Sequence, residues 1–282
     1  MRAPAAKVIV LNAAAGLVTV AALVGAVRSM FFSPAATPCS ERYLNMTALG
    51  LERAGVLLTA ADLQAGVSGR DAGVIENVAI TRREGAPAPL VIGVSLPKGS
   101  ASPRWSGGPK GGMSFPWEPR SLQNKTAACL GYHVLLPADF DFFDGGVLPG
   151  LAGAESAERG DRFSARLAWR PRGGAGATVR VSDNGVTRAS PAEVKVFELS
   201  PGRWVKIEQE VVLNTPKKSD GILRVWVDGA LAIDRADIAY RSKPEVTIAA
   251  VAADVHYGGE GPHGAAPKDA KVWLSPFEVR WQ

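Results

Sequence analysis

The sequence has few of the residues and motifs that most often carry enzymatic or metal chemistry. Its 282 residues include two cysteines and three histidines, and His133, His256 and His263 do not have the spacing of metal ligands. It also lacks a Gly-x-Ser-x-Gly nucleophile elbow, a phosphate-binding glycine-rich loop and a His-Glu-x-x-His helix. These absences argue against α/β-hydrolases, P-loop nucleotide enzymes and zinc proteases, and we predict neither a metal nor a cofactor.

A concentrated basic region is also lacking. The formal net charge is +5 and the isoelectric point is about 9.3, but the basic residues are scattered singly along the chain. Nucleic-acid binding is therefore not favoured. A mildly basic domain suits an acidic glycan, because cationic clefts concentrate anionic ligands by long-range attraction. Solubility alone would explain the same charge.

One long apolar run is present, at the N-terminus. Arg2 and Lys7 precede a 19-residue apolar stretch, Val8–Ala26. A membrane-spanning helix needs about 20 such residues, so this run is long enough to act as an anchor. Val24–Ala26 also offers the small residues that a signal peptidase cleaves after. Residues 1–28 are predicted to be a signal peptide or a membrane anchor, and either predicts export to the periplasm, the membrane or the medium.

A proline- and alanine-containing segment, residues 29–38, is predicted to be a linker. The folded domain is then expected over residues 39–282, a length that suits one large β domain. Cys39 and Cys129 are 90 residues apart. In a chain that reaches an oxidising compartment the two thiols can pair, and we predict that they form a disulfide.

Most of the domain has the period-two alternation of β-strands, in short runs separated by Gly, Pro, Asn or Asp. No helix-length apolar periodicity separates these runs, which excludes a parallel α/β sheet. We therefore predict an all-β fold, an antiparallel β-sandwich of the jelly-roll or concanavalin-like kind, with the hydrophobic helix at its N-terminus. The predicted strands are 75–81, 90–96, 129–136, 163–170, 178–182, 194–199, 204–213, 221–227, 230–234, 246–257 and 272–281.

Two local features are more specific than the strand pattern. Residues 47–66 have helix-like spacing, with Thr59 and Asp62 as candidate caps, and predict one or two short surface helices. Asp228 and Gly229 stand between two apolar runs and tolerate the positive φ angles of a type I′ turn, so they predict a two-residue β-hairpin.

Four segments resemble the polysaccharide lyase family 14 domain, and the resemblance extends in order over roughly two thirds of the chain, from about Leu90 to Asp269. It implies a β-jelly roll that cleaves uronic-acid polysaccharides such as alginate or glucuronan by β-elimination, and hence an acidic polysaccharide as the partner. The four segments are Tyr132–Gly153, Phe163–Arg170, Leu213–Pro216 and Asp220–Gly229.

The resemblance also suggests which residues bind the glycan. Such a lyase must neutralise a carboxylate, remove the C5 proton and protonate the leaving oxygen. Ser164 and Arg166 match the family's Ser-x-Arg strand and, by alternation, share one face. Arg166 is our candidate for holding the carboxylate, with Arg170 and Arg180 as further candidates; the alternative is that Arg166 pairs with a neighbouring acid on the sheet surface.

Departures from the family pattern concern the acid and base. The family's Gly-Gly-Lys-Leu-Pro-Gly is changed here so that Val147 replaces the lysine, and our alignment places Val179 and Val181 where the family has two tyrosines. Valine neither donates nor accepts a proton. His256 and Tyr257, on opposite faces of their strand, replace two phenylalanines and introduce titratable groups; either is a candidate base if it faces the cleft.

Three more residues are candidates for substrate binding. Trp105 and Lys110 lie in a segment rich in Gly and Pro, where an aromatic ring can stack on a sugar or pack in the core. Gln209 occupies a family-like position, where hydrogen bonding between strands is the alternative role.

Three functions remain open at this point. The first is a lyase, and the second is a non-catalytic polysaccharide-binding or envelope structural protein on a degenerate lyase scaffold. The third is a glycoside hydrolase, which needs two carboxylates about 5 to 10 Å apart. Asp139, Asp141 and Glu208 are available for it, but nothing in their spacing favours this activity.

Overall fold

The structure is a computed structural model, and it describes residues 37–67, 69–154, 160–189, 197–258 and 263–282. The predicted signal peptide or anchor, residues 1–28, and most of the predicted linker lie outside the described residues. In those described ranges, no helix is long and apolar enough to cross a membrane. Residues Pro38–Gln282 form one compact unit.

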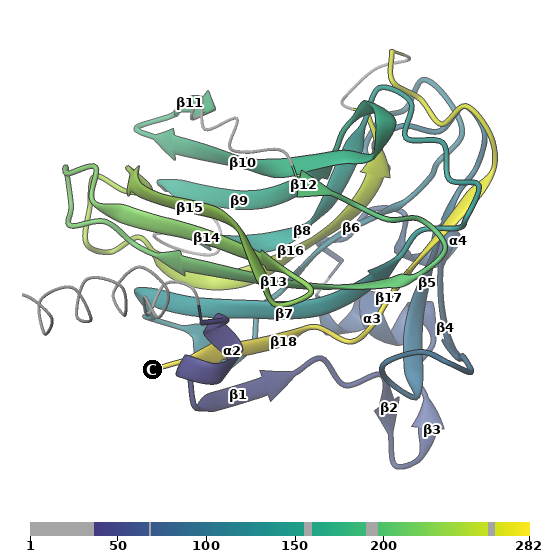
Figure 1. Cartoon of the computed structure of the whole chain (residues 1–282), viewed down its shortest axis with the longest axis horizontal. Coiled ribbons are helices and arrows are strands. Elements are labelled where there is room, and N and C mark those ends of the chain that lie inside the picture. The colour runs from purple at the N-terminus through teal and green to yellow at the C-terminus, as the bar shows by residue number, and fades with distance from the viewer. Residues whose placement is uncertain (1–36, 68, 155–159, 190–196, 259–262) are drawn as a thin grey trace, which may run out of the picture. The chain divides into compact units, whose positions relative to one another are not determined.

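Two antiparallel sheets pack face to face (Figure 1), which confirms the predicted all-β sandwich. Over the described residues the first sheet has nine strands: β15 (Ala230–Ile238), β14 (Gly221–Val227), β13 (Trp204–Val212), β7 (Ala127–Leu135), β17 (Ala270–Leu274), β5 (Leu90–Leu96) and β4 (Val78–Arg82) in order, with β18 (Glu278–Trp281) between β7 and β1 (Asn45–Ala48). The second has seven: β11 (Val186–Ala189), β10 (Gly174–Asp183), β9 (Arg162–Trp169), β8 (Gly146–Ala154), β16 (Thr247–Tyr257) and β6 (Met113–Trp117) in order, with β12 (Phe197–Glu198) beside β10.

The remaining elements are short and lie around the sandwich. They are the α-helices α2 (Cys39–Arg42), α3 (Ala60–Gly66) and α4 (Val74–Asn77), the 3₁₀ turns η1 (Arg120–Leu122) and η2 (Pro171–Gly173), and the small hairpin of β2 (Glu52–Arg53) with β3 (Val56–Leu57). Thr59 caps α3 through a reciprocal hydrogen-bonding pair with Asp62, as predicted.

Several predicted strands match the structure closely, and the differences have local causes. Strands 90–96 and 221–227 have the predicted bounds, and the hairpin at Asp228 and Gly229 has the predicted positive φ angles of 49° and 81°. The predicted strand 272–281 is divided into β17 and β18 by a proline-containing segment. Strands β6 and β8 were not predicted, because their glycines and prolines interrupt the apolar alternation.

The core lies between the sheets, and two polar side chains cross it. The Gln209 Oε1 atom accepts from Leu151 N at 2.8 Å, and its Nε2 atom donates to Ala165 O at 2.8 Å. The Tyr132 hydroxyl donates to Pro149 O at 3.1 Å. Both side chains come from the nine-stranded sheet and satisfy backbone groups beside the irregular register of β8. Gln209 is therefore fully buried and holds the two sheets together, contrary to the expectation that it binds substrate.

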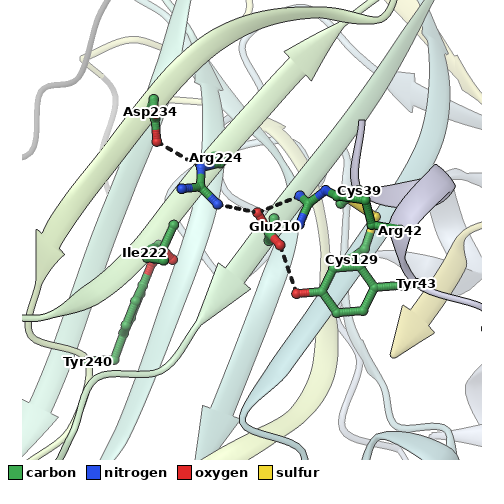
Figure 2. Close-up of polar contacts among 9 residues, drawn as sticks. All are labelled: Cys39, Arg42, Tyr43, Cys129, Glu210, Ile222, Arg224, Asp234 and Tyr240. Carbon is green, nitrogen blue, oxygen red and sulfur yellow. Dashed lines mark hydrogen bonds and ion pairs between the residues drawn. A yellow bond between two sulfur atoms is a disulfide. The ribbon is translucent and has the colours of Figure 1, made fainter. Parts of the chain in front are cut away.

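The N-terminal end of the domain is fixed to the outer face of the nine-stranded sheet. The predicted disulfide between Cys39 and Cys129 is confirmed, and it joins α2 to β7. Figure 2 shows the ion-pair network beside it, in which Glu210 lies between Arg224 on one side and Arg42 and Tyr43 on the other.

Glu210 is the centre of this network. Its carboxylate accepts from Arg42 Nη2 at 2.9 Å, from the Tyr43 hydroxyl at 2.8 Å and from Arg224 Nη1 at 3.1 Å. Arg224 Nε also donates to Asp234 at 2.8 Å. Burial on its own would raise the pKa of Glu210, but the hydrogen bonds from Arg42 and Tyr43 outweigh it and hold that pKa below its ordinary value. The charges within this network are therefore paired with one another.

Candidate functional site

The outer face of the seven-stranded sheet carries a groove. Two adjoining cavities of about 580 Å³ and 600 Å³ share Ser164, Arg166 and Arg180 in their lining, and together they define what we call the groove. Its floor is open because many outward-facing side chains are small. These small residues include Ser114, Ala152, Ala154, Ser164, Ala168 and Ala250.

Strand alternation explains why the polar residues gather there. On β9 the residues Phe163, Ala165 and Leu167 face the core, so Ser164 and Arg166 face outward together, as predicted. On the neighbouring strand β10, Arg180 is paired with Ser164 and Thr178 is paired with Arg166. The antiparallel register therefore places these four outward-facing side chains beside one another.

Arg166 lines the groove and also pairs with an acid. Its Nε atom lies 2.9 Å from Asp254 Oδ2, and Asp254 on β16 is only 4% exposed. The Arg166 side chain keeps 36% of its surface exposed. Asp254 therefore contacts the Nε side of the Arg166 guanidinium, while part of the Arg166 side chain still faces the groove. The two alternatives left open for Arg166, a groove cation and an ion-pair partner, are thus met by the same residue.

His256 lies two residues beyond Asp254 on the same face of β16 and lines the groove. Its Nδ1 atom is 3.0 Å from the backbone carbonyl of Tyr257. Because a carbonyl only accepts, we assign the proton to Nδ1, which leaves Nε2 as an acceptor. Burial lowers the pKa of His256 below its ordinary value, more than the nearby Asp254 raises it. The neutral imidazole is therefore the form present at neutral pH.

The groove carries an excess of positive charge. Glu118 and Asp254 are its acidic residues, and Glu118 is held by Arg70 through two hydrogen bonds of 2.7 Å and 2.6 Å. Among the described residues that line the groove there is neither a lysine nor a tyrosine. The four arginines that line it are Arg104, Arg162, Arg166 and Arg180.

Tyr257 does not face the groove. It is fully buried, and its ring packs against Phe140 and Trp169 with ring centroids 5.6 Å and 5.3 Å away. Its hydroxyl donates to the backbone carbonyl of Asp141. Burial raises the pKa of Tyr257 well above its ordinary value. Adjacent strand residues face opposite sides of a sheet, so His256 faces the groove and Tyr257 faces the core. The expectation that Tyr257 acts as a base is therefore corrected.

Three other predicted binding residues also lie outside the lining of the groove. Arg170 precedes the turn η2, where its backbone N donates to Gly174 O at 2.6 Å. Trp105 lies against the backbone of Gly107 and Gly108, two residues of its own loop. Lys110 pairs with Glu76 at 2.7 Å on the surface. Loop packing holds Trp105 and an ion pair holds Lys110 away from the groove, and the sequence composition predicts neither contact.

The three valines at the altered family positions differ in orientation. Val147 lines the groove and is paired with His256 across β8 and β16. Val179 is fully buried and Val181 packs against the core, so both face away from the groove. On β10 the groove positions belong to Thr178 and Arg180.

The carboxylates considered for glycoside hydrolysis do not converge. Asp139 pairs with Lys268 at 2.6 Å, and the Asp141 side chain accepts from Phe143 N at 3.0 Å. Glu208 lies on the outer face of the other sheet, where Lys206 is 3.0 Å away. These three acids do not form the pair that a glycosidase needs.

Sequence reasoning missed Asp254 and Arg104. Asp254 and His256 are alternate polar residues in the otherwise apolar strand β16, and this pattern could have identified a polar face. Arg104 lies in an irregular loop and donates to Ser114 Oγ at 3.5 Å. No sequence signal indicates that the loop brings it to the groove.

Comparison with solved structures shows the fold. The marine PL-14 alginate lyase from Aplysia kurodai is similar with a TM-score of 0.66 and 18% identity, over 85% of this chain and 99% of that one. An alginate lyase from a Chlorella virus is similar with a TM-score of 0.61 and 20% identity, over 84% of this chain and 99% of that one. An endo-β-1,4-glucuronan lyase from the fungus Trichoderma reesei is similar with a TM-score of 0.50 and 11% identity, over 73% of this chain and 87% of that one.

A search of curated proteins gives no match. A family model does match, and it covers residues 86–277, which is more than half of the chain. The matched segment contains β8, β9, β10 and β16, the strands that supply most of the groove. On this match, the chain belongs to the polysaccharide lyase 14 family.

Proposed function

We propose that this chain is an exported protein of the polysaccharide lyase type that binds acidic, uronate-containing polysaccharide in the groove. One observation carries the proposal: Arg166, fixed at its base by Asp254, faces an open floor of small side chains with three further arginines around it. Guanidinium groups bind carboxylates through paired hydrogen bonds, and a chain of uronates presents one carboxylate per sugar.

Cleavage by β-elimination is favoured by the state of His256. A base removes the C5 proton while the uronate carboxylate is neutralised; a double bond forms between C4 and C5, and the C4–oxygen bond breaks. We propose that Nε2 of His256 takes this proton and that Arg166 neutralises the carboxylate. The protonated His256 can then give this proton to the leaving oxygen, which returns the histidine to its neutral form for the next turnover.

The first test follows the unsaturated uronate product by its ultraviolet absorbance after full-length protein is incubated with alginate, glucuronan and related polyuronates. We expect a rise that His256→Gln abolishes while glycan binding is retained. The rate should fall as the pH drops through the lowered pKa of His256, because only the neutral imidazole accepts a proton. Absorbance that rises equally with His256→Gln would contradict the assignment of the base.

A binding-only function is the second candidate, and Val147 favours it. This residue lines the groove where the family pattern has lysine, and Tyr257 is buried in the core. In that case wild-type protein retains polyuronate without any rise in absorbance. Val147→Lys, placed beside His256, is then the variant in which cleavage should appear, with Val56→Lys on the exposed strand β3 as the matched control.

Export is supported by the N-terminal apolar run and by the disulfide between Cys39 and Cys129, since disulfides persist in oxidising compartments. Fractionation of cells that express the full chain tests this part of the proposal. Sequencing the N-terminus of the mature protein separates the two possibilities, because a cleaved leader removes the apolar run and an anchor keeps it. Recovery only in the cytoplasm would contradict export.

A further inference from the structure

A second basic hollow lies behind the hairpin formed by β10 and β11. It has a volume of about 520 Å³, and we call it the edge cavity. Val181, Asp183 and Arg188 of the hairpin line it, whereas Arg180, Ser182 and Thr187 of the same hairpin line the groove. Because successive strand residues face opposite sides, only the thickness of this hairpin separates the two hollows.

Positive charge in the edge cavity is not balanced by local ion pairs. Arg188, Lys217 and Lys218 are exposed, and Arg241 is half-buried. Within the described ranges, no carboxylate forms a salt bridge with any of these four residues. The cavity therefore offers four cations to an anionic ligand.

Arg241 is oriented by hydrogen bonds to backbone carbonyls. Its Nε atom donates to Asn214 O at 3.0 Å, and its Nη1 atom donates to Pro244 O at 3.0 Å and to Val246 O at 2.8 Å. These backbone carbonyls orient the guanidinium, and Glu245 acts on its charge from nearby without forming a salt bridge. Such a fixed cation beside a hollow needs little reorganisation to receive a carboxylate.

Among the described residues, two carboxylates line the edge cavity, and each accepts hydrogen bonds. Asp237 accepts two hydrogen bonds from Arg235, each of 2.6 Å. Asp183 accepts from Asn184 Nδ2 and from Ser242 Oγ, each at 3.0 Å. Asp237 is thus paired with an arginine outside the set of four, whereas Asp183 has only neutral donors. With four cations against these two carboxylates, the described lining keeps an excess of positive charge.

The route between the hollows passes over an edge strand. In the described sheet, β11 is the last strand, and all four of its residues are exposed. Arg180 on the groove side is paired with Ala189, which lines the edge cavity. A flexible polymer that lies along the groove can therefore turn over β11 and reach the second set of cations.

We propose that the edge cavity is a second binding site for carboxylates of the same acidic polysaccharide, occupied by the part of a long chain that leaves the groove over β11. This inference rests on the proposed function of the groove. It predicts that a long polyuronate binds more tightly than a short one, because two linked contacts reinforce each other.

The test compares the affinities of a long polyuronate and a uronate tetrasaccharide for full-length wild-type protein and for the double variant Lys217→Glu/Lys218→Glu. Arg241 is left unchanged, since it also holds three backbone carbonyls. The double variant should bind the long polymer about tenfold more weakly and the tetrasaccharide within about twofold of wild type. The matched control, Arg53→Glu/Lys98→Glu, alters net charge equally with two exposed residues outside both hollows.

Each result decides one question. If the tetrasaccharide binds and the double variant keeps wild-type affinity for the long polymer, the second site does not exist. An equal loss in the control pair would attribute the effect to net charge and also overturn the site. If wild type binds neither glycan, the proposed function of the groove fails and this site fails with it.

Discussion

The outer faces of the two sheets both carry buried charge, but they arrange it differently. On the nine-stranded sheet, Glu210 receives hydrogen bonds from three residues and is covered by α2 (Figure 2). On the seven-stranded sheet, Asp254 pairs with one arginine that keeps a third of its surface exposed. In the first arrangement the charged groups pair with one another, whereas in the second the exposed part of the Arg166 guanidinium can still bind a ligand.

The two outer faces also differ in whether other parts of the chain cover them. The disulfide between Cys39 and Cys129 fixes α2 over the nine-stranded sheet. Over the groove, alanine and serine side chains leave space instead. Buried ion pairs alone therefore do not mark a binding site; in this molecule, open space together with unbalanced charge separates the groove from the structural face.

The largest expected effect comes from removing the disulfide. It closes a separation of 90 residues, for which the chain-entropy model gives a stabilisation of about 4.6 kcal/mol. Cys39→Ala/Cys129→Ala should lower the free energy of unfolding by about this amount, measured by urea denaturation. Glycan affinity under native conditions should stay unchanged, because the disulfide lies on the opposite face. A parallel loss of affinity in folded protein would show that the two faces are coupled.

The next largest effect is expected at Glu210. Glu210→Gln leaves Arg42 and Arg224 without their shared carboxylate and should cost about 3 kcal/mol of unfolding free energy. The matched control is Glu278→Gln, which removes an exposed pair with Arg280 and should cost under about 1 kcal/mol. Equal costs for the two variants would mean that Glu210 is not a buried structural charge.

The pH dependence sharpens this comparison. The folded pKa of Glu210 lies below that of an unfolded glutamate, about 4.3. Its stabilisation is therefore fully present above that unfolded value and is lost as the pH falls through the folded pKa. Wild type should lose stability more steeply on acidification than Glu210→Gln in urea titrations at stepped pH. Parallel curves would contradict the lowered pKa.

The smallest effect is expected at the rim of the groove. Arg180 is exposed and lines both cavities. Arg180→Ala should change the free energy of unfolding by less than about 0.5 kcal/mol but weaken polyuronate binding about threefold. Arg53→Ala, at an exposed position on β2, is the control and should alter neither quantity. Equal affinities for the two variants would exclude Arg180 from the binding surface.

The sequence predicted the sandwich and part of the groove for a common reason. Period-two alternation is local, so it identified strands such as Leu90–Leu96 and placed Ser164 and Arg166 on one face. Which face of a strand meets the core depends on tertiary packing. This is why Tyr257 and Gln209, predicted at the site, are in the core.

Residues brought to the groove by other segments were harder to predict. Asp254 was readable only as a polar interruption of an apolar strand, and Arg104 reaches the groove from an irregular loop. The partners of Trp105 and Lys110 likewise depend on loop geometry, which no periodicity encodes. The prediction therefore failed mainly where a residue's role is set by distant chain segments.

The most direct test of the account is the affinity of full-length protein for an acidic polysaccharide with and without the groove's central cation. Arg166→Ala/Asp254→Asn removes the ion pair without leaving an unpaired charge. We expect polyuronate affinity to fall at least about tenfold, as the loss of a charge-assisted hydrogen bond implies, with Arg280→Ala on the other sheet as the control. Unchanged affinity in a folded double variant would contradict the claim that this groove binds the polysaccharide.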